Sequence, residues 1–156
     1  MRVDAVETRE WFLREIQERC PNVHYLEDQS HVTVGGIIVY GSPWQPTFHK
    51  WAFNLDRGQP CLSAWEKIPT ETDVLLTHGP PLGRGDKCFP MGFRAGCVDL
   101  LHQVQDRIKP KVHVFGHIHE GFGASSDGTT DFINASTCTF AYRPTNKVVI
   151  FDIDPT

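Results

Sequence analysis

The chain has 156 residues, 40% of them hydrophobic, which is enough for one globular domain with a core of its own. Its formal net charge is -4 and no segment is dense in lysine or arginine, which argues against polymeric nucleic acid as a partner. The longest apolar run, residues 37–40, is far shorter than the ~20 residues of a membrane-spanning helix, so we expect no membrane segment.

The cysteines are scattered along the sequence at Cys20, Cys61, Cys88, Cys97 and Cys138. Their number is odd, no two of them form a C-x-x-C pair, and no apolar signal segment follows the first residue. A secreted domain of this size would be expected to carry paired cysteines behind a signal peptide. The pattern therefore predicts a cytoplasmic protein in a reducing compartment.

An amphipathic helix is predicted for the segment TREWFLREIQERCP, residues 8–21. Phe12, Ile16 and Cys20 recur four residues apart, which places them on one face of a helix. Proline cannot continue a helix, so Pro21 marks its end.

Two short β-strands are predicted next, at residues 31–34 and 37–41. Gly35 and Gly36 separate them, and this dipeptide supplies the positive φ of a tight hairpin. The second segment is apolar on both faces, which is typical of a strand in the interior of a sheet.

Residues 42–69 are rich in proline, glycine and large aromatic side chains, and we expect a long loop with a short helical turn. Connections longer than about 15 residues are uncommon in compact domains and are often functional. The aromatic side chains either cap the core or form a wall of a substrate site, with Trp44 as the candidate substrate contact. The aromatic residues are Trp44, Phe48, Trp51, Phe53 and Trp65.

A strand, a helix and a second strand are predicted between residues 73 and 116. The strands are residues 73–77 and 111–116, and the helix is residues 96–108. The apolar stripe of this helix is expected to consist of Val98, Leu101, Val104 and Ile108. Such crossovers join parallel strands, so both strands end at one edge of the sheet, where open α/β sheets bind ligands.

Antiparallel strands are predicted after Gly123, in the segments TTDFINAS, CTFAY and KVVIFDI. The tetrapeptide at residues 143–146, Arg-Pro-Thr-Asn, supplies a turn between the last two. No internal repeat or low-complexity tract is present. The prediction is therefore an α/β protein with mixed sheets.

Three histidines lie at the predicted strand ends: His78 after the first strand of the crossover, and His117 and His119 after the second. Residues two apart on an extended segment point to the same side, and neutral imidazole is the commonest metal ligand at physiological pH. We therefore predict a metal site made of these three residues. His113 lies within the second strand and is expected to be a hydrogen-bonded buried residue rather than a ligand.

Two blocks of sequence, THGPP and FGHIHEG, look like the last two metal-ligand blocks of the calcineurin-like metallophosphoesterases, whose final motif is Gly-His-x-His. More narrowly, the sequence resembles the metallophosphoesterase domain-containing proteins of animals. That resemblance rests on the ordered segments VYGSPWQP, FNLDRGQ, THGPPLG, AGCVDLL, HVFGHIHEG and INASTCT. They run from about residue 30 to the C-terminus and so cover most of the chain.

The resemblance implies a four-layer sandwich of two mixed sheets flanked by helices, and two divalent metal ions at the site. By match to the motifs, His78 and His117 would ligate one ion and His119 the other, and Glu120 is either an assisting acid or a solvated one. Mn²⁺, Fe and Zn²⁺ all accept such ligands. The implied reaction is metal-assisted hydrolysis of a small phosphodiester or nucleotide.

The N-terminal metal-ligand blocks of the family are absent from this sequence. It contains no Asp-x-His and no Gly-Asn-His, and Gly85-Asp86 lacks the second aspartate of Gly-Asp-x-x-Asp. Residues 1–156 are therefore expected to form a single partial domain, the C-terminal part of the fold. Either the chain is a fragment, a short isoform or a truncated gene product, or another molecule supplies the remainder.

Two functions follow from this partial match. The first is a metal-dependent phosphoesterase whose activity is impaired in the chain alone. The alternative is a non-catalytic remnant that binds metal or a protein partner. In both cases strands left without neighbours would expose their edges, which predicts self-association.

The segment of residues 82–95, between THGPP and the following helix, carries four charged side chains: Arg84, Asp86, Lys87 and Arg94. A cation beside the metal site would complement the charge of a phosphate. Arg84 is our candidate for that role. The alternative is that these residues are ordinary surface charges.

Overall fold

The computed structural model of the chain describes residues 5–33 and 35–154. The first elements are α1 (Ala5–Phe12), continued by the wider turn η1 (Leu13–Gln17), then β1 (Gln29–Val32), β2 (Ile38–Ser42), β3 (Gln45–Pro46), β4 (Asn54–Leu55), α2 (Gln59–Trp65) and β5 (Val74–Thr77). They are followed by α3 (Val98–His102), its wider-turn continuation η2 (Gln103–Ile108), β6 (Val112–Phe115), the single turn η3 (His119–Gly121), β7 (Gly123–Ser126) and β8 (Asp131–Asn134).

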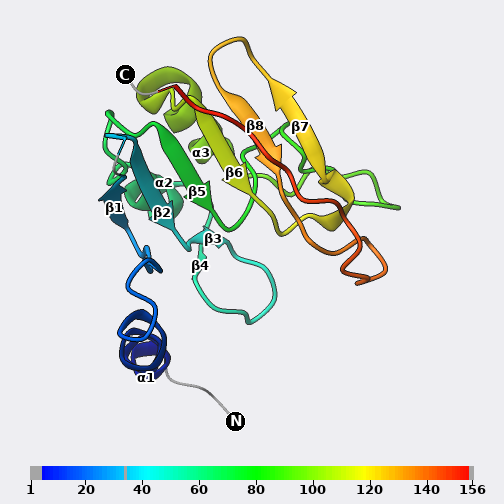
Figure 1. Ribbon diagram of the computed structural model, residues 1–156. Coiled ribbons are helices and arrows are strands. Elements are labelled where there is room, and N and C mark those ends of the chain that lie inside the picture. Colours follow the sequence, from blue (N-terminus) through cyan, green and yellow to red (C-terminus); the bar gives the residue numbers. More distant parts are fainter. Residues whose placement is uncertain (1–4, 34, 155–156) are drawn as a thin grey trace.

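Six strands form one mixed sheet in the order β1-β2-β5-β6-β8-β7 (Figure 1). The four inner strands run parallel, whereas β1 pairs antiparallel with β2 and β7 antiparallel with β8. The predicted hairpin and the predicted parallel crossover are both confirmed, and β2 is an interior strand as expected. Val34, the last residue of the first predicted strand, lies outside the described residues.

The core lies between one face of this sheet and the helices α2, α3 and η2. The sheet contributes Tyr40, Leu75, Phe115 and Phe132, and the helical side contributes Cys61, Ala64, Trp65, Ile68, Leu100, Val104 and Ile108. Arg107 joins the helices, because its guanidinium donates to the carbonyls of Trp65 and Ile68 at 2.9 and 2.8 Å. These bonds link η2 to the C-terminal end of α2.

The buried stripe of α3 and η2 differs from the predicted one. Leu100, Val104 and Ile108 are buried, whereas Val98 is 40% exposed. The three buried residues are four apart, and in this helix the wider turns of η2 favour that spacing over a step of three. Residues 42–69 are also more regular than predicted, because they contain β3, β4 and α2.

The opposite face of the sheet is crossed by the C-terminal segment, residues 147–154 (Figure 1). The predicted strands CTFAY and KVVIFDI do not form. A strand needs a hydrogen-bonded neighbour, and among the described residues no backbone hydrogen bond joins 147–154 to another segment. Val148 and Ile150 are consequently 85% and 86% exposed.

The fold is thus the mixed α/β architecture that was expected, present in part. The described chain holds one large sheet with helices on one face, rather than both sheets of a four-layer sandwich. α1 lies apart from the sheet (Figure 1). None of the helices within residues 5–33 and 35–154 has the length and apolar character that crossing a membrane requires.

Candidate metal site

The adjacent parallel strands β5 and β6 bring two of the predicted ligands together. His78 directly follows β5 and His117 lies just beyond β6, and the strand ends are joined where the Gly116 N–H donates to the His78 carbonyl at 3.0 Å. Nε2 of His78 and Nδ1 of His117 are 3.0 Å apart. The strand-helix-strand pattern therefore places two imidazoles in direct contact at the sheet edge.

Both imidazoles are held in the neutral form that binds metals. Burial lowers the pKa of His78, and burial together with the nearby His78 and His119 lowers the pKa of His117 to about 4. Two nitrogens that ligate one ion at about 2.1 Å, with ligand angles of about 90 to 109°, are about 3.0–3.4 Å apart. The observed nitrogen separation fits a shared cation.

His117 has a backbone φ of 67°, a left-handed conformation that is uncommon for residues other than glycine. Ile118 is extended, and η3 begins at His119. The expectation of a continuous extended segment from 117 to 119 is therefore wrong. Such strained residues are found at functional sites, where the surrounding structure holds them in place.

The ring of His119 lies between the backbone of Thr139 and the ring of Tyr142. Its Nδ1 is 3.1 Å from the Thr139 carbonyl, and the two ring centroids are 5.0 Å apart. A carbonyl only accepts, so Nδ1 carries a proton, and in the neutral tautomer the lone pair lies on Nε2. This is the usual state of a metal-binding histidine, whose second nitrogen donates to a backbone carbonyl.

The three histidines do not form one cluster. Within the described residues no group of three or more His, Cys, Asp or Glu side chains is placed to hold a single ion. The structure brings His78 and His117 together, whereas His119 makes its contacts with Thr139 and Tyr142, and the assignment of the three residues to two ions stays a prediction. The Glu120 carboxylate is engaged elsewhere, because it accepts from the Phe89 N–H at 2.8 Å.

His113 stabilises the end of β5, which precedes His78. Its side chain is fully buried, and its Nε2 lies 2.9 Å from the hydroxyl of Thr77, which itself donates to the Gly79 carbonyl at 2.8 Å. The hydroxyl proton is thereby used, so His113 donates from Nε2. The prediction of a buried, hydrogen-bonded histidine is confirmed, and its contact fixes the strand end that carries His78.

Asn134 is a second supporting residue, which sequence reasoning missed. It is buried at the end of β8, and its amide donates to the carbonyls of Gly85 and Ile118 at 3.0 and 2.8 Å. Its own oxygen accepts from the Ser136 N–H at 3.0 Å. The available signal was a polar residue that ends an apolar strand within INAS.

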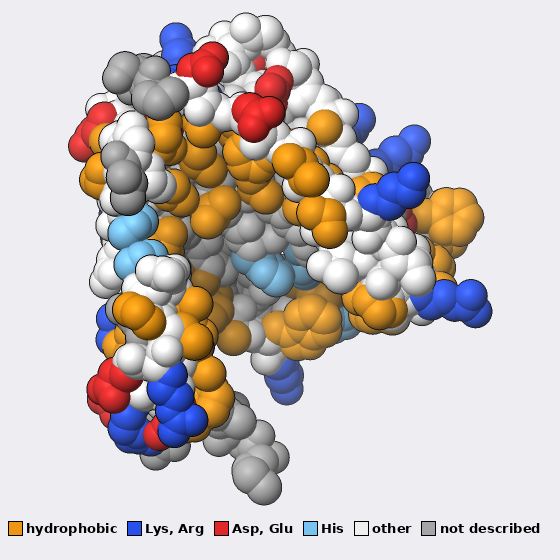
Figure 2. All heavy atoms as spheres, in the orientation of Figure 1, with side chains coloured by type: hydrophobic (Ala, Val, Ile, Leu, Met, Phe, Trp, Pro, Cys, Tyr) orange, Lys and Arg blue, Asp and Glu red, His pale blue; other side chains and the backbone are white. Residues whose placement is uncertain are grey.

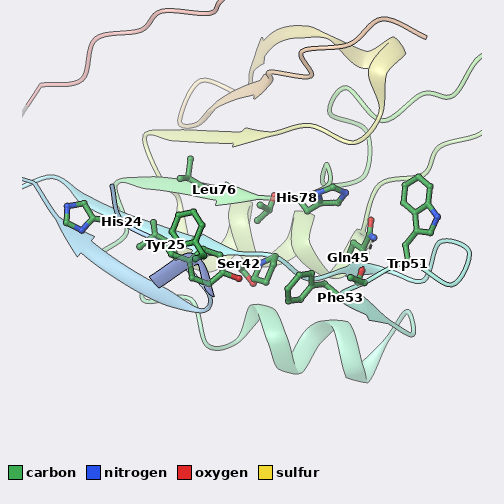
Figure 3. Close-up of a pocket in the computed structure, with 14 residues that line it drawn as sticks. His24, Tyr25, Ser42, Gln45, Trp51, Phe53, Leu76 and His78 are labelled. Carbon is green, nitrogen blue, oxygen red and sulfur yellow. Dashed lines mark hydrogen bonds between the residues drawn. The ribbon is translucent and has the colours of Figure 1, made fainter. Parts of the chain in front are cut away.

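An apolar cavity of about 540 Å³ borders His78. Figure 3 shows His78 and Trp51 at one part of it and His24, Tyr25 and Leu76 at another. Trp51 and Phe48 also approach His117, with ring centroids 6.4 and 5.2 Å away. The loop after β3 therefore brings aromatic side chains to the paired histidines.

Trp44 is placed differently from these rings. Its indole nitrogen donates to Asp28 at 2.8 Å, and its ring packs against the core cluster. This position matches the core-capping alternative. A role for Trp44 in substrate binding remains a prediction.

Arg84 does not point toward the histidines. Its guanidinium lies 4.4 Å from the centre of the Phe132 ring, 3.7 Å from Asp127, and 3.4 Å from the Ser126 carbonyl. Arg94 is paired with the fully buried Asp86 at 2.6 Å. Two of the cations in residues 82–95 therefore stabilise the structure locally, and substrate binding by Arg84 is a prediction only.

The strand topology defines a mixed α/β domain. Two solved structures share this fold: one has a TM-score of 0.61 at 21% identity over 81% of this chain and 52% of the other. The second, the crystal structure of TT1561 of Thermus thermophilus, has a TM-score of 0.56 at 12% identity over 85% of this chain and 59% of the other. No protein-family model matches the sequence.

Curated sequences give a closer relationship. Metallophosphoesterase domain-containing protein 1 of Homo sapiens is 52% identical over 138 residues, which cover 88% of this chain and 42% of that protein. UPF0046 protein T07D4.2 of Caenorhabditis elegans is 53% identical over 132 residues, 85% of this chain and 33% of that protein. The chain is thus a relative of the metallophosphoesterase domain-containing proteins, and it spans less than half the length of these two.

Proposed function

We propose that this chain carries the C-terminal part of a metal-dependent phosphoesterase site, acting on a small phosphodiester or nucleotide. The observation that carries the proposal is the pair of neutral imidazoles, His78 and His117, with nitrogens 3.0 Å apart at adjacent strand ends. In this proposal they hold one divalent ion, and Nε2 of His119 holds a second. The ions would be Mn²⁺, Fe or Zn²⁺.

The chain's own residues would bind and orient the ions. The lowered pKa values keep His78 and His117 neutral at neutral pH. An ion bound between them would replace the proton of the hydrogen bond that now joins their facing nitrogens. Thr77 and His113 hold the strand end that precedes His78, and Asn134 donates to the Ile118 carbonyl in the loop that carries His117 and His119. When bound, two divalent ions would polarise the phosphoryl group and generate a hydroxide nucleophile near neutral pH.

The acidic ligands of a complete site would come from outside the described residues. Within them, no carboxylate joins the three histidines in one cluster. We therefore propose that the chain alone hydrolyses phosphodiesters weakly. The longer relatives have room for such ligands, since this chain covers 42% of the human protein.

A second candidate function is a non-catalytic protein that binds metal or a partner. The observation that favours it is the exposure of Val148 and Ile150 on a segment without a strand neighbour among the described residues. Self-association through the outer strands of the sheet, β1 and β7, and through these exposed side chains is part of this proposal. We also propose a cytoplasmic location, because all five cysteines are free.

Metal uptake is the direct test of the proposed ligands. Calorimetric titration of the chain with Zn²⁺ or Mn²⁺ should show uptake that the double substitution His117→Ala with His119→Ala abolishes. His102→Ala, on the exposed side of α3, is the matched control and should leave uptake unchanged. Unchanged stoichiometry in the double variant would refute the ligand assignment.

Turnover separates the two candidate functions. The chain should be assayed with Mn²⁺ and bis-p-nitrophenyl phosphate, alone and with an N-terminal fragment of a longer relative. Activity that appears only on addition of the fragment supports the phosphoesterase. Metal uptake without turnover in either mixture favours the binding protein.

A further inference from the structure

Three exposed aromatic rings surround the His119 side of the candidate site. Phe89, Phe140 and Tyr142 are 65%, 54% and 74% exposed. Tyr142 contacts the His119 ring at a centroid distance of 5.0 Å, and Phe140 meets Phe89 edge to face at 5.8 Å. The Phe89 N–H is bonded to Glu120, the next residue after His119. We call Phe89, Phe140 and Tyr142 the aromatic platform.

The platform is held in place by its own backbone framework. The turn under Phe140 and Tyr142 is closed by hydrogen bonds from Thr139 N to the Arg143 carbonyl and from Tyr142 N to the Thr139 carbonyl, at 2.9 and 2.8 Å. The amide of Asn146 adds a bond to the Cys138 carbonyl at 3.0 Å. The rings are therefore presented on an ordered surface.

The hairpin that presents Phe89 is fixed in a similar way. Cys88 N donates to the Phe93 carbonyl at 2.9 Å. At the base of the hairpin, Asp86 is fully buried and bonded to Arg94 at 2.6 Å. An exposed ring on such a framework has lost much of the mobility that binding would otherwise have to restrict.

Tyr142 is in an unfavourable position for a merely structural residue. Its backbone φ is 56°, in the left-handed region where glycine or asparagine is normally found. Its ring buries little surface within the described chain, since 74% of the residue is exposed. A bulky, strained and exposed aromatic residue beside a candidate metal ligand indicates a binding role.

Charged residues of both signs lie next to the platform. The Glu120 carboxylate accepts from the Phe89 N–H. Lys87 lies two residues before Phe89 and Arg143 directly after Tyr142, and neither cation forms an ion pair with a described side chain. Figure 2 shows hydrophobic side chains with Lys and Arg side chains around them at the right-hand edge of the molecule. Aromatic surface and unpaired cations together suit a ligand with an anionic and an apolar part.

We infer that the aromatic platform binds the planar apolar ester group of the phosphate ester whose phosphoryl group lies at the histidines. This inference rests on the proposed function and names its substrate class: phosphate esters of an aromatic alcohol, or of another group with a flat apolar face. Rings of this kind pair edge to face or offset at the contact distances seen between Phe89 and Phe140.

Two non-hydrolysable ligands test the inference on the intact chain. With Zn²⁺ present, phenylphosphonate should bind about tenfold more tightly than methylphosphonate, the preference expected of one or two aromatic contacts. In Phe140→Ala the preference should fall to within about twofold, with methylphosphonate affinity unchanged. Tyr142→Ala should also lose the preference, and because Tyr142 contacts His119, its phenylphosphonate affinity is compared with its own methylphosphonate affinity. Trp11→Ala is the matched control, since Trp11 is 51% exposed on the distant α1 and should keep the full preference.

The outcomes separate the platform from the proposed function. Metal and methylphosphonate binding without a phenyl preference would overturn the platform and leave the proposed function standing. Phenylphosphonate shifts in the ring NMR signals of Tyr142, without metal uptake, would support the platform and contradict the proposed metal site. Concentration-dependent dimerisation that the platform variants abolish, without a phenyl preference, would identify a second copy as the occupant and overturn the inference.

Discussion

Acidification should destabilise this chain, and His113 should account for a separable part of the loss beside His78 and His117, whose pKa values are lowered as well. His113 is fully buried, and burial lowers its pKa from 6.5 to about 3. Its Nε2 donates to Thr77, while its Nδ1 has no partner among the described residues. A second proton would therefore be placed on Nδ1 in a position where nothing accepts it.

The sign and size of the effect follow from the two pKa values. Between pH 3 and 6.5 the unfolded chain binds the proton and the folded chain does not, so stability falls as pH falls through this range. The free energy of unfolding falls by about 1.4 kcal/mol for each pH unit below 6.5, the pKa of this histidine in the unfolded chain. At pH 5 the loss is about 2 kcal/mol. This loss at pH 5 requires only that the folded pKa lie well below 5.

Urea unfolding at pH 7.5 and pH 5.0 measures the effect, and His113→Phe isolates it. Phenylalanine keeps a flat ring next to Phe115 and Phe132 and cannot titrate. The stability difference between variant and parent should therefore shift by about 2 kcal/mol in favour of the variant at the lower pH. His102→Gln, at an exposed position, should follow the parent.

A difference between parent and His113→Phe that stays constant within about 0.5 kcal/mol over this range would refute the reasoning. A His113 imidazole signal that titrates near 6.5 in the folded chain would refute it independently, because it would show that the proton finds an acceptor.

Three further perturbations test the framework around the site. Gly121→Ala should lower the free energy of unfolding by at least about 1–3 kcal/mol, because a Cβ there would overlap the Gly85 carbonyl. Thermal unfolding measures this loss, and an unchanged Tm would contradict the close packing of Gly121 against Gly85. Asn134→Ala should cost about 1–3 kcal/mol, because buried carbonyls lose their amide donor, and it should weaken Zn²⁺ uptake in calorimetry; uptake at the parent's affinity would show that the loop does not depend on it. Sedimentation velocity should show association that rises with concentration and is reduced in Ile150→Lys, whose parent side chain is 86% exposed. A monomer at every concentration would exclude the segment 147–154 as a contact.

The site was only partly predictable because its parts lie far apart in the sequence. The crossover rule placed His78 and His117 at one edge, and the structure has their nitrogens 3.0 Å apart. The prediction that residues 117–119 form one extended segment is wrong, because His117 adopts a left-handed backbone conformation. Only the tertiary structure shows which aromatic residues lie near the site. Phe48 and Trp51 reach His117, whereas Trp44 packs on the core.

The sequence by itself determined the elements with a strong local signal: the Gly35-Gly36 hairpin and the parallel crossover. Their periodicity and turn residues depend only on neighbours in the chain. The N-terminal helix forms as well, but it ends at Gln17 rather than at Pro21, so Cys20 lies outside it. Tertiary structure decided which residues of α3 were buried, since Leu100 rather than Val98 faces the sheet. It also decided against a strand at 147–154, because β-propensity forms a strand only where another backbone supplies hydrogen bonds, and among the described residues none does.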